Sequence, residues 1–515
     1  MNTVFNLISS IHPDLNAIGT VNAEDGSGKP SLDYNSLTDV MKSTISALNA
    51  IGIGRGDRVA IVLPNGPEMA VSFLAVAAGA SAAPLNPAYR ADEFDFYMSD
   101  LGAKAVIVME GDDTPAISVA QKRNIPVLTL KAGAHAGSFM LDTSAAAPAD
   151  AAKNGPSEPD DEALVLHTSG TTSRPKVVPL SNKNVTTSAH NIKSTLMLTD
   201  TDRGLNIMPM FHIHGLIASL LSSMAAGAEV VFSPGFNALK IFQWFDEVKP
   251  SWYTAVPTMH QAIVSRAKRN TDILQAMKLR FVRSSSSSLP VPVMEDVEAT
   301  FGCAVIEAYG MTEAAHQMAS NPLPPKDRKP GSVGMAAGPE VAILSADGEA
   351  VDTGGEGEIC IRGANVFTGY ENNDAANAEA FHGEWFRTGD QGYLDDDGYL
   401  RISGRLKEII NRGGEKISPR EVDDVIQAHG DVAQVVTFAL PHPKLGEEVA
   451  AVIVLDEGSQ DKDAKDVEAD IKAFASAKLA DFKVPRVIKF IDEIPKGATG
   501  KLQRIGLAEK LGMTS

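Results

Sequence analysis

Short hydrophobic runs rich in β-branched residues alternate with longer mixed segments between residues 30 and 310. Examples are the runs at 58–63, 105–108 and 229–232, and a turn signal follows each of them. Strands that alternate with helical segments are typical of α/β layers with largely parallel sheets, because each helix returns the chain to the same end of the sheet. The chain has 515 residues, too many for one hydrophobic core. We therefore expect a large N-terminal unit built from several α/β subdomains.

The pattern changes after residue 340. A glycine-rich turn at 354–358 precedes a short strand-like run at 359–363. The residues Asp395-Asp396-Asp397-Gly398 form a turn signal between two further strand-like runs. Tight turns between short runs are typical of antiparallel hairpins. This region is predicted to be a β-rich unit that belongs to the large N-terminal domain.

Another α/β piece begins near residue 406. Strands are expected near 432–440 and 449–455, and a helix is expected near 466–479. This order of elements predicts a small α+β unit at the C-terminus. The predicted division of the chain is an N-terminal domain at 1–404, a hinge at 405–407 and a small mobile C-terminal domain at 408–515.

Composition limits the partners and the compartment. The formal net charge of −19 and the pI near 5.0 disfavour nucleic acid and anionic lipid as partners. Only two cysteines are present, Cys303 and Cys360, which fits a reducing compartment. Residues 1–10 do not resemble a signal peptide, 513–515 are not Ser-Lys-Leu, and the apolar stretch at 216–232 is too short and polar for a membrane span. We expect a cytoplasmic protein without a membrane span.

The strongest chemical signal is the run from His167 to Lys176, which follows the strand-like residues 163–166. Its glycine and hydroxyl residues let backbone N–H groups approach phosphate oxygens, and Lys176 adds positive charge. The run does not match the Walker loop, because no glycine precedes Lys176 and Val177 stands where a hydroxyl would bind magnesium. The predicted ATP-binding residues of this run are Thr168, Ser169, Gly170, Thr171, Thr172 and Lys176.

Further motifs follow along the chain at 206–215, 307–313, 385–390, 404–408, 412–417 and 495–501. With the phosphate-binding run, these motifs resemble in residues and order the adenylate-forming superfamily of acyl-CoA synthetases, luciferases and peptide-synthetase adenylation domains. The resemblance covers residues 30 to 505. It implies that the chain uses ATP and Mg²⁺ to activate a carboxylic acid as an acyl-adenylate, and then transfers the acyl group to coenzyme A.

The resemblance implies roles for residues of the nucleotide site. Glu313 would be the ligand of the Mg²⁺ that accompanies ATP, since a carboxylate and phosphate oxygens suit this ion. Thr312 would bind the α-phosphate, and Tyr309 would stack on the adenine ring. Asp390 would accept hydrogen bonds from the ribose hydroxyls, and Arg405 would help to hold the ribose and phosphate. Two other residues of the same motif complete the implied nucleotide site, Glu307 and Ala308.

Lys501 is implied to be the catalytic lysine of adenylation. The reaction brings a carboxylate against a phosphate, and a cation between them offsets the repulsion. His212 is implied to lie between the acid site and the thiol channel, and we rank His214 below it as a functional candidate. Lys407 is implied to be the hinge about which the C-terminal domain turns between the two half-reactions. The implied coenzyme A channel includes Gly413 and Gly414.

Two residues depart from the superfamily pattern in the phosphate-binding run. Ser173 and Val177 stand where glycine is usual. Valine strongly disfavours a positive φ. Either Val177 perturbs the loop and weakens ATP binding, or Val177 and Val178 start the next strand earlier.

The acid pocket is expected between the segment at 283–289 and the residues that follow Glu313. Five consecutive serines occupy 284–288, and Ala314-Ala315-His316-Gln317 follow the glutamate. Hydroxyls and an imidazole suit a second carboxylate rather than an alkyl tail. Blocks at 166–176, 252–258 and 320–324 resemble the oxalate–CoA ligase branch most. That branch implies that Ser286 and His316, with His212 and Lys501, bind oxalate; the dianion would favour a protonated, charged His316.

Three alternatives remain open at this point. The acid could be a medium-chain fatty acid or a 4-coumarate-type acid. The chain could also serve a carrier protein, as peptide-synthetase adenylation domains do, although no carrier domain follows in this sequence. A non-catalytic ligand-binding relative is the third, and the presence of both Glu313 and Lys501 argues against it.

Overall fold

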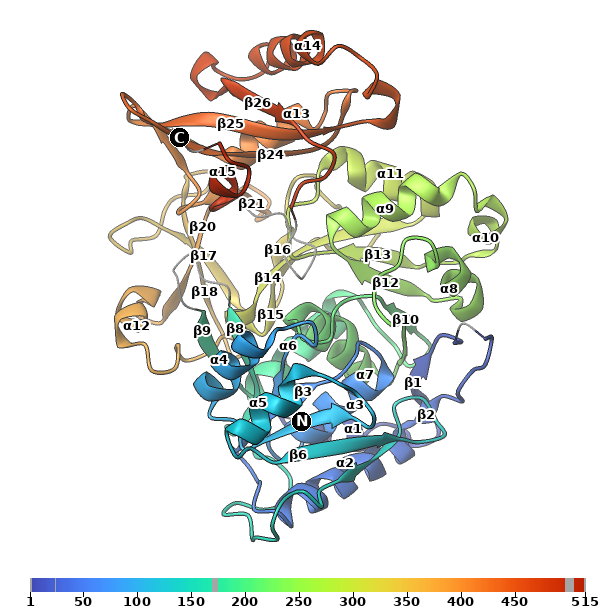
Figure 1. Cartoon of the computed structure of the whole chain (residues 1–515). Helices are drawn as coiled ribbons and strands as arrows, with labels where there is room; N and C mark the ends of the chain where they lie inside the picture. The colour runs from blue at the N-terminus through green and yellow to red at the C-terminus, as the bar shows by residue number, and fades with distance from the viewer. Residues whose placement is uncertain (1, 24, 169–174, 496–503, 514–515) are drawn as a thin grey trace.

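The computed structural model describes residues 2–23, 25–168, 175–495 and 504–513. Figure 1 shows a large unit, coloured blue to light orange, with the darker orange and red C-terminal unit above it in this view. The predicted α/β layers, β-rich unit and smaller C-terminal α+β unit are all present, so the predicted fold class is confirmed. No helix within the described residues is long and apolar enough to cross a bilayer.

The first sheet of the large unit has seven strands in the order β7-β6-β5-β3-β4-β8-β9. Its central strands β6, β5, β3, β4 and β8 pair in parallel, and the edge strands β7 and β9 are antiparallel to their neighbours. The strand bounds are β3 Arg58–Val62, β4 Ser81–Pro84, β5 Ala105–Met109, β6 Val127–Ala132, β7 Phe139–Asp142, β8 Glu162–Thr168 and β9 Lys176–Ser181.

The second sheet has nine strands in the order β16-β15-β14-β13-β12-β10-β11-β1-β2. The strands from β14 to β1 pair in parallel, and β2, β15 and β16 are antiparallel. The strand bounds are β1 Asn16–Thr20, β2 Leu32–Asp33, β10 Arg203–Asn206, β11 Glu229–Phe232, β12 Trp252–Ala255, β13 Phe281–Ser284, β14 Ala304–Met311, β15 His316–Ser320 and β16 Met335–Ala336.

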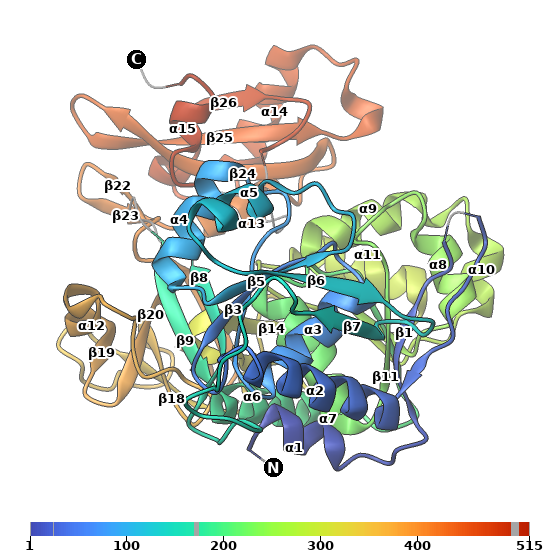
Figure 2. The same cartoon turned by 60° about the horizontal axis from the view of Figure 1, so that its bottom comes forward.

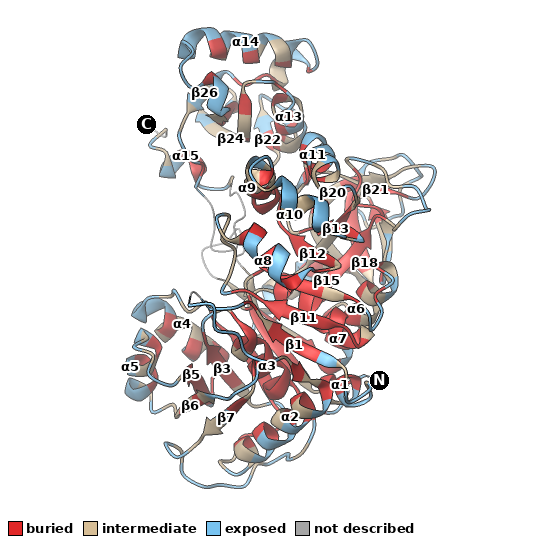
Figure 3. Cartoon of the chain, turned by 90° about the vertical axis from the view of Figure 1, so that its right-hand side faces the viewer, coloured by how far each residue is buried: buried red, intermediate tan, exposed pale blue. Residues whose placement is uncertain are grey.

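A hydrophobic core joins residues of α3, α6 and η1 to both sheets. Helix α3 is buried along its whole length except at Glu68, as expected for a helix that is apolar on all faces. Figure 2 shows the helices that accompany the two sheets, and Figure 3 shows how burial concentrates where the sheets and helices meet. The helix bounds are α1 Val4–Ser9, α2 Tyr34–Asn49, α3 Pro67–Ala77, α4 Ala91–Leu101, α5 Pro115–Lys122, α6 Asn182–Thr195, η1 His214–Leu221, α7 Ser222–Ala226, α8 Ile241–Val248, α9 Pro257–Ala267, α10 Thr271–Ala276, α11 Val291–Phe301 and η2 Thr312–Ala314.

The apolar stretch at 216–232 forms parts of this core. It contains most of the π-helix η1, the helix α7 and the strand β11. Gly227 ends α7 in a left-handed conformation with φ of +74°, a backbone geometry that glycine adopts readily. The chain then turns into β11, so this stretch is core of the large unit.

The β-rich unit follows the second sheet. Its strands are β17 Glu340–Leu344, β18 Gly357–Arg362, β19 Phe381–His382, β20 Trp385–Leu394 and β21 Leu400–Arg405, with α12 at Asp374–Ala380. The turn at 395–398 joins β20 to β21 as an antiparallel hairpin, as the sequence predicts. The hairpin places Asp390 directly opposite Arg405.

The C-terminal unit has a sheet in the order β23-β22-β25-β24, and β26 pairs with β25. Alternate residues of β25 face two separate hydrophobic clusters, one with α13 and α14 and one with α15, as the two faces of a strand require. Here β25 begins at Gly446, earlier than expected, and the helix α14 ends at Ser476. The element bounds are β22 Ile410–Arg412, β23 Glu415–Ile417, α13 Pro419–Ile426, β24 Val432–His442, β25 Gly446–Leu455, η3 Glu457–Ser459, α14 Ala464–Ser476, η4 Asp481–Lys483, β26 Val487–Phe490 and α15 Leu507–Lys510.

The linker between the two units lies between the end of β21 at Arg405 and the start of β22 at Ile410. The hydroxyl of Ser418, which caps α13, donates to the carbonyl of Ser403 in β21. The C-terminal unit therefore contacts the β-rich unit next to this linker. The boundary at 404, the hinge at 405–407 and the movement about Lys407 stay predictions.

Candidate active site

Three predicted nucleotide-binding residues from distant motifs come together around Asp390. Tyr309 of β14 donates a hydrogen bond from its hydroxyl to Asp390 Oδ2. Arg405 Nε donates to Asp390 Oδ1 over 3.1 Å. Asp390 is 6% exposed, so these two donors stabilise a buried carboxylate. A carboxylate has about four acceptor positions, and the two that remain can accept hydrogen bonds from a ribose diol.

Glu313 lies in a second cluster, with Tyr370 and Lys176. The Glu313 side chain is 5% exposed, and the Tyr370 hydroxyl donates to its Oε1 over 2.9 Å. Lys176 Nζ lies 4.1 Å from the centre of the Tyr370 ring. Burial raises the pKa of Glu313, while the Tyr370 hydrogen bond and the charge of Lys176 oppose that shift. A divalent cation would relieve the same desolvation, so this buried carboxylate fits a Mg²⁺ ligand.

Positive charge also lies at this cluster. Burial lowers the pKa of Lys176, and the nearby charge of Lys407 lowers it further, against the opposing effect of Glu313. Two lysines from distant segments therefore act on the same region. In a chain with a net charge of −19, such local charge is required to attract a polyphosphate.

The departure from the superfamily pattern at Val177 is resolved by the strand β9. Val177 pairs with His167 across the β8–β9 ladder, and its side chain is buried. The second alternative holds, because the strand starts at Lys176 and Val177 needs no left-handed backbone. Thr168 and Lys176 form the last pair of this ladder. The predicted residues Ser169, Gly170, Thr171 and Thr172, like Lys501, lie outside the described residues.

Glu307 and Ala308 support the serine-rich segment. The backbone N–H of Leu289 donates to Glu307 Oε1 over 3.1 Å, and the Ser285 hydroxyl donates to the Ala308 carbonyl over 2.8 Å. Burial raises the pKa of Glu307 to about 7. These contacts fix the serine segment against β14. Thr312 lies beside Glu313 in η2, and its role at the α-phosphate stays a prediction.

Two of the residues predicted to bind the acid, Ser286 and His316, lie at a pair of stacked histidines. The rings of His316 and His214 are 5.0 Å apart between centroids, with 23° between their planes. Ser286 Oγ is 2.9 Å from His214 Nδ1, and Thr254 Oγ1 is 2.6 Å from His214 Nε2. His316 and His214 are both buried. Ser286 and His316, 30 positions apart in the sequence, therefore belong to one polar cluster.

The two histidines of the 206–215 motif differ in their contacts. His214 contacts Ser286, and His212 Nδ1 accepts the backbone N–H of His214 over 3.2 Å. The role of His212 between the acid site and the thiol channel stays a prediction. Tyr370 was not predicted from the sequence, because a single tyrosine after Gly369 carries no signal of its own.

Ser286 and His316 are two of the seven non-glycine residues with a positive φ in the described part of the chain. Ser286 has φ of +74° and His316 has φ of +98°. Non-glycine residues in this region cost about 1–3 kcal/mol each and persist only where the surroundings impose them. These two lie in the same polar cluster, which therefore contains two strained backbone positions.

The comparisons with known proteins agree with these clusters. A family model described as AMP-binding enzyme matches residues 12–371, and a model for the AMP-binding enzyme C-terminal domain matches residues 421–501. The chain belongs to the AMP-binding enzyme family. An oxalate–CoA ligase of Arabidopsis thaliana is 46% identical over 93% of this chain and 93% of the relative. An oxalate–CoA ligase of Saccharomyces cerevisiae is 40% identical over 90% of this chain and 88% of the relative.

Among solved structures, ATP-bound MatB from Rhodopseudomonas palustris is similar to this AMP-binding enzyme over the whole chain. Its TM-score is 0.86 at 30% identity, and the match covers 99% of each chain. The family assignment therefore extends to the C-terminal unit. Gly413 and Gly414 lie there in the turn between β22 and β23, with φ of +62° and +102°. Their role in a coenzyme A channel stays a prediction.

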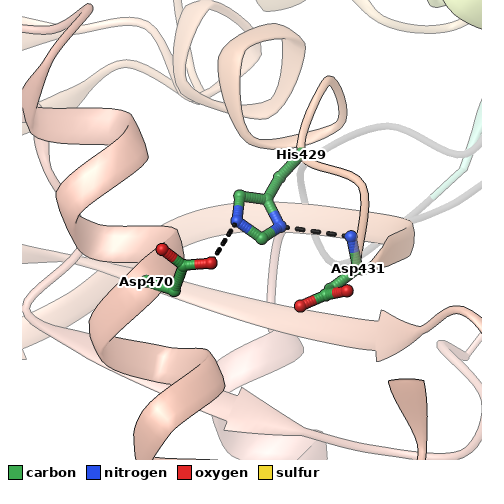
Figure 4. Close-up of side chains that lie close together, drawn as sticks. All are labelled: His429, Asp431 and Asp470. Atoms are coloured by element: carbon green, nitrogen blue, oxygen red, sulfur yellow. Dashed lines mark hydrogen bonds and ion pairs between the residues drawn. The ribbon is translucent and has the colours of Figure 1, made fainter.

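One cluster of potential metal ligands lies in the C-terminal unit of this AMP-binding enzyme, at His429, Asp431 and Asp470 (Figure 4). His429 Nδ1 accepts the backbone N–H of Asp431 over 3.2 Å, and Nε2 lies 3.3 Å from Asp470 Oδ2. The Asp431 carboxylate accepts from Ser459 and from Lys462, each over 2.6 Å. Both ring nitrogens already have partners and Lys462 supplies the cation, so these contacts fit a structural cluster.

Proposed function

We propose that this AMP-binding enzyme is an ATP-dependent oxalate–CoA ligase, which converts oxalate, ATP and coenzyme A to oxalyl-CoA, AMP and diphosphate. The names of the Arabidopsis and yeast relatives support this proposal. The observation that carries it is the polar cluster of Ser286, His214 and His316 in the expected acid pocket.

The cluster favours a short diacid over a fatty or aromatic acid. Its hydroxyl and imidazole groups are polar, and two of its residues hold a costly left-handed backbone. An alkyl or aryl group placed against these donors would desolvate them without replacing their hydrogen bonds, which costs about 1–3 kcal/mol per group. A carboxylate would accept from them instead, and such charge-assisted bonds are the stronger ones.

The first half-reaction joins oxalate to the α-phosphate. A carboxylate oxygen of oxalate attacks the α-phosphorus, the bond to the bridging oxygen breaks, and diphosphate leaves. In this proposal the Tyr309, Asp390 and Arg405 cluster holds the nucleoside. Glu313 would hold the Mg²⁺ that accompanies ATP, and this ion would offset the charge of the phosphates. Lys501 would offset the repulsion between the two anions.

The second half-reaction forms the thioester. The coenzyme A thiol loses its proton, its sulfur attacks the oxalyl carbonyl carbon, and the bond to AMP breaks. Because Lys501 and the thiol must reach the same carbonyl, the C-terminal unit would turn about Lys407 between the two steps.

A panel of acids tests the proposal. We would measure AMP release with and without coenzyme A for oxalate, malonate, hexanoate and 4-coumarate, in the wild type and in His316→Ala. Oxalate should have the highest kcat/KM, and His316→Ala should reduce it about tenfold to a hundredfold, from the loss of one charge-assisted hydrogen bond. His135→Ala is the matched control, because His135 is an exposed loop residue.

Each outcome of the panel has a defined meaning. A higher kcat/KM for hexanoate or 4-coumarate would refute the substrate assignment while leaving an acid–CoA ligase. A preference for malonate would mean that the pocket is one methylene longer than proposed. AMP release that does not depend on coenzyme A as acyl acceptor would favour a carrier protein instead.

A further inference from the structure

Arg283 is a fully buried cation next to the stacked histidines. It lies on β13, where it pairs with Thr254 of β12 and Ile306 of β14, and it is 0% exposed. Its side-chain hydrogen bonds within the described part of the chain go to His316 and Gln317, and no carboxylate there pairs with it. A buried charge without an opposite charge is costly. A site that tolerates this cost is poised to accept an anion.

Arg283 determines the protonation of His316. Arg283 Nη1 lies 3.3 Å from His316 Nε2, and a guanidinium has only donors to offer. His316 Nε2 must therefore accept, and the ring is neutral with its proton on Nδ1. A second proton on His316 would point at the guanidinium, so Arg283 opposes the protonation that a nearby dianion would favour.

A continuous series of contacts connects the Arg283 guanidinium to Ser286 in the expected acid pocket. His316 stacks on His214, and His214 contacts both Ser286 and Thr254. Thr254 is the in-register neighbour of Arg283 on the adjacent strand. Burial lowers the pKa of Arg283 to about 9, so the side chain stays charged at neutral pH.

We propose that Arg283 is the fixed positive charge of the acid pocket and selects acids that carry a second anionic group. Arg283 acts as a positioning residue, because it donates a hydrogen bond to Nε2 of the neutral His316 and keeps a permanent positive charge next to the imidazole ring. This inference rests on the proposed oxalate–CoA ligase function and names the group that confers its preference for a dianion. The alternative is a purely structural arginine that joins β13 to β15 through Gln317.

Comparison of oxalate with oxamate distinguishes an Arg283 that selects a second negative charge from an Arg283 that is purely structural. It has the shape of oxalate, but a neutral amide replaces the second carboxylate. We would measure kcat and KM for adenylation of oxalate and oxamate, by diphosphate exchange into ATP, in the wild type, Arg283→Lys and Arg283→Met. The spectator charge is present before and during the reaction, so its loss should raise KM more than it lowers kcat.

The expected result is a change in the ratio of the two substrates. Arg283→Met should lower kcat/KM for oxalate about tenfold to a hundredfold and change oxamate little, so that the oxalate-to-oxamate ratio falls. Arg283→Lys keeps the charge without the planar fork, and should have an intermediate ratio. Equal losses for both substrates would overturn the proposal, because a structural defect does not distinguish them.

Arg280→Met is the matched control. Arg280 precedes the same strand, but its guanidinium pairs with Asp202 over 2.6 Å and is partly exposed. Its loss removes an arginine next to β13 and should leave the substrate ratio unchanged. A fall of the ratio in this control equal to that in Arg283→Met would also overturn the proposal.

The pH dependence of the oxalate-to-oxamate ratio tests the same proposal without a substitution at Arg283, which could impair folding. The charged or titratable groups of the described chain next to the pocket are Arg283, His316, His214 and Glu307, whose carboxylate supports the serine segment. A fixed Arg283 charge predicts an oxalate-to-oxamate ratio that stays constant between about pH 6 and pH 8 in Glu307→Gln, where the carboxylate no longer ionises. A ratio that still falls in that variant as the pH rises would assign the charge to a histidine, since an imidazolium loses its proton in this range. If the wild type adenylates hexanoate and not oxalate, the proposed function itself fails, which is a distinct outcome.

Discussion

Replacement of Ser286 by glycine should relieve backbone strain and impair the activity at the same time. Ser286 holds φ of +74°, and its hydroxyl lies 2.9 Å from His214 Nδ1. Glycine adopts that backbone without steric cost but offers no hydroxyl. The single substitution therefore separates the strain at this position from its chemistry.

The magnitudes follow from these two features. The left-handed backbone costs about 1–3 kcal/mol for a serine, and the greater freedom of glycine in the unfolded chain cancels about 0.5–1 kcal/mol of the relief. Relative to Ser286→Ala, which lacks the same hydroxyl, we expect Ser286→Gly to be more stable by about 1 kcal/mol. The lost hydroxyl should lower kcat/KM for oxalate about tenfold to a hundredfold, as expected for a hydrogen bond to a charged group.

Urea unfolding followed by tryptophan fluorescence measures the stability. Trp252 is a suitable probe, because it is buried on β12 and pairs with β13 at Phe281. Ser286→Ala is the first control, since it removes the hydroxyl and retains the strain. Ser287→Gly is the second, because Ser287 is exposed and has no positive φ, so glycine there can only destabilise.

The expected order of urea midpoints is Ser286→Gly above Ser286→Ala, because both variants lose the hydrogen bond to His214 and only glycine relieves the backbone strain. Both Ser286 variants should lose oxalate activity to a similar extent. A midpoint for Ser286→Gly at or below that of Ser286→Ala would show that the backbone at Ser286 is not strained. Full oxalate activity in either variant would remove Ser286 from the acid site.

Three further predictions concern the nucleotide side. Lys501→Ala should abolish oxalyl-adenylate formation and spare attack of coenzyme A on supplied oxalyl-AMP; equal loss of both steps would contradict a role limited to adenylation. Glu313→Gln should lower turnover at least about tenfold at limiting Mg²⁺ with the fold intact, and an unchanged rate against Mg²⁺ concentration would make Glu313 structural. Glu307 has a pKa of about 7, raised from 4.5 by burial, so the stability it contributes is greatest at low pH and is lost as the pH rises through 7. The wild-type urea midpoint should therefore fall relative to that of Glu307→Gln as the pH rises from about 5 to about 8. A difference between the two midpoints that stays constant over this range would refute the shifted pKa.

The amino-acid sequence alone predicted the α/β, β-rich and α+β units in their order along the chain, and most of the candidate site residues. Alternating hydrophobic runs predict the parallel sheets, because strand and helix periods differ along the chain itself. The Asp395–Gly398 turn predicts the hairpin that the structure shows. Motif residues such as Tyr309, Asp390 and Arg405 could be listed before their contacts were known, since the resemblance is carried by residue types in a fixed order.

Only the tertiary structure decided how those groups act on one another. Arg283 meets His316 from 33 positions away, and Tyr370 meets Glu313 from 57 positions away. Hydrogen-bond partners of buried groups depend on how sheets and helices pack, which no local pattern encodes. For that reason the sequence indicated the histidine of the acid pocket but not the buried Arg283 that contacts it.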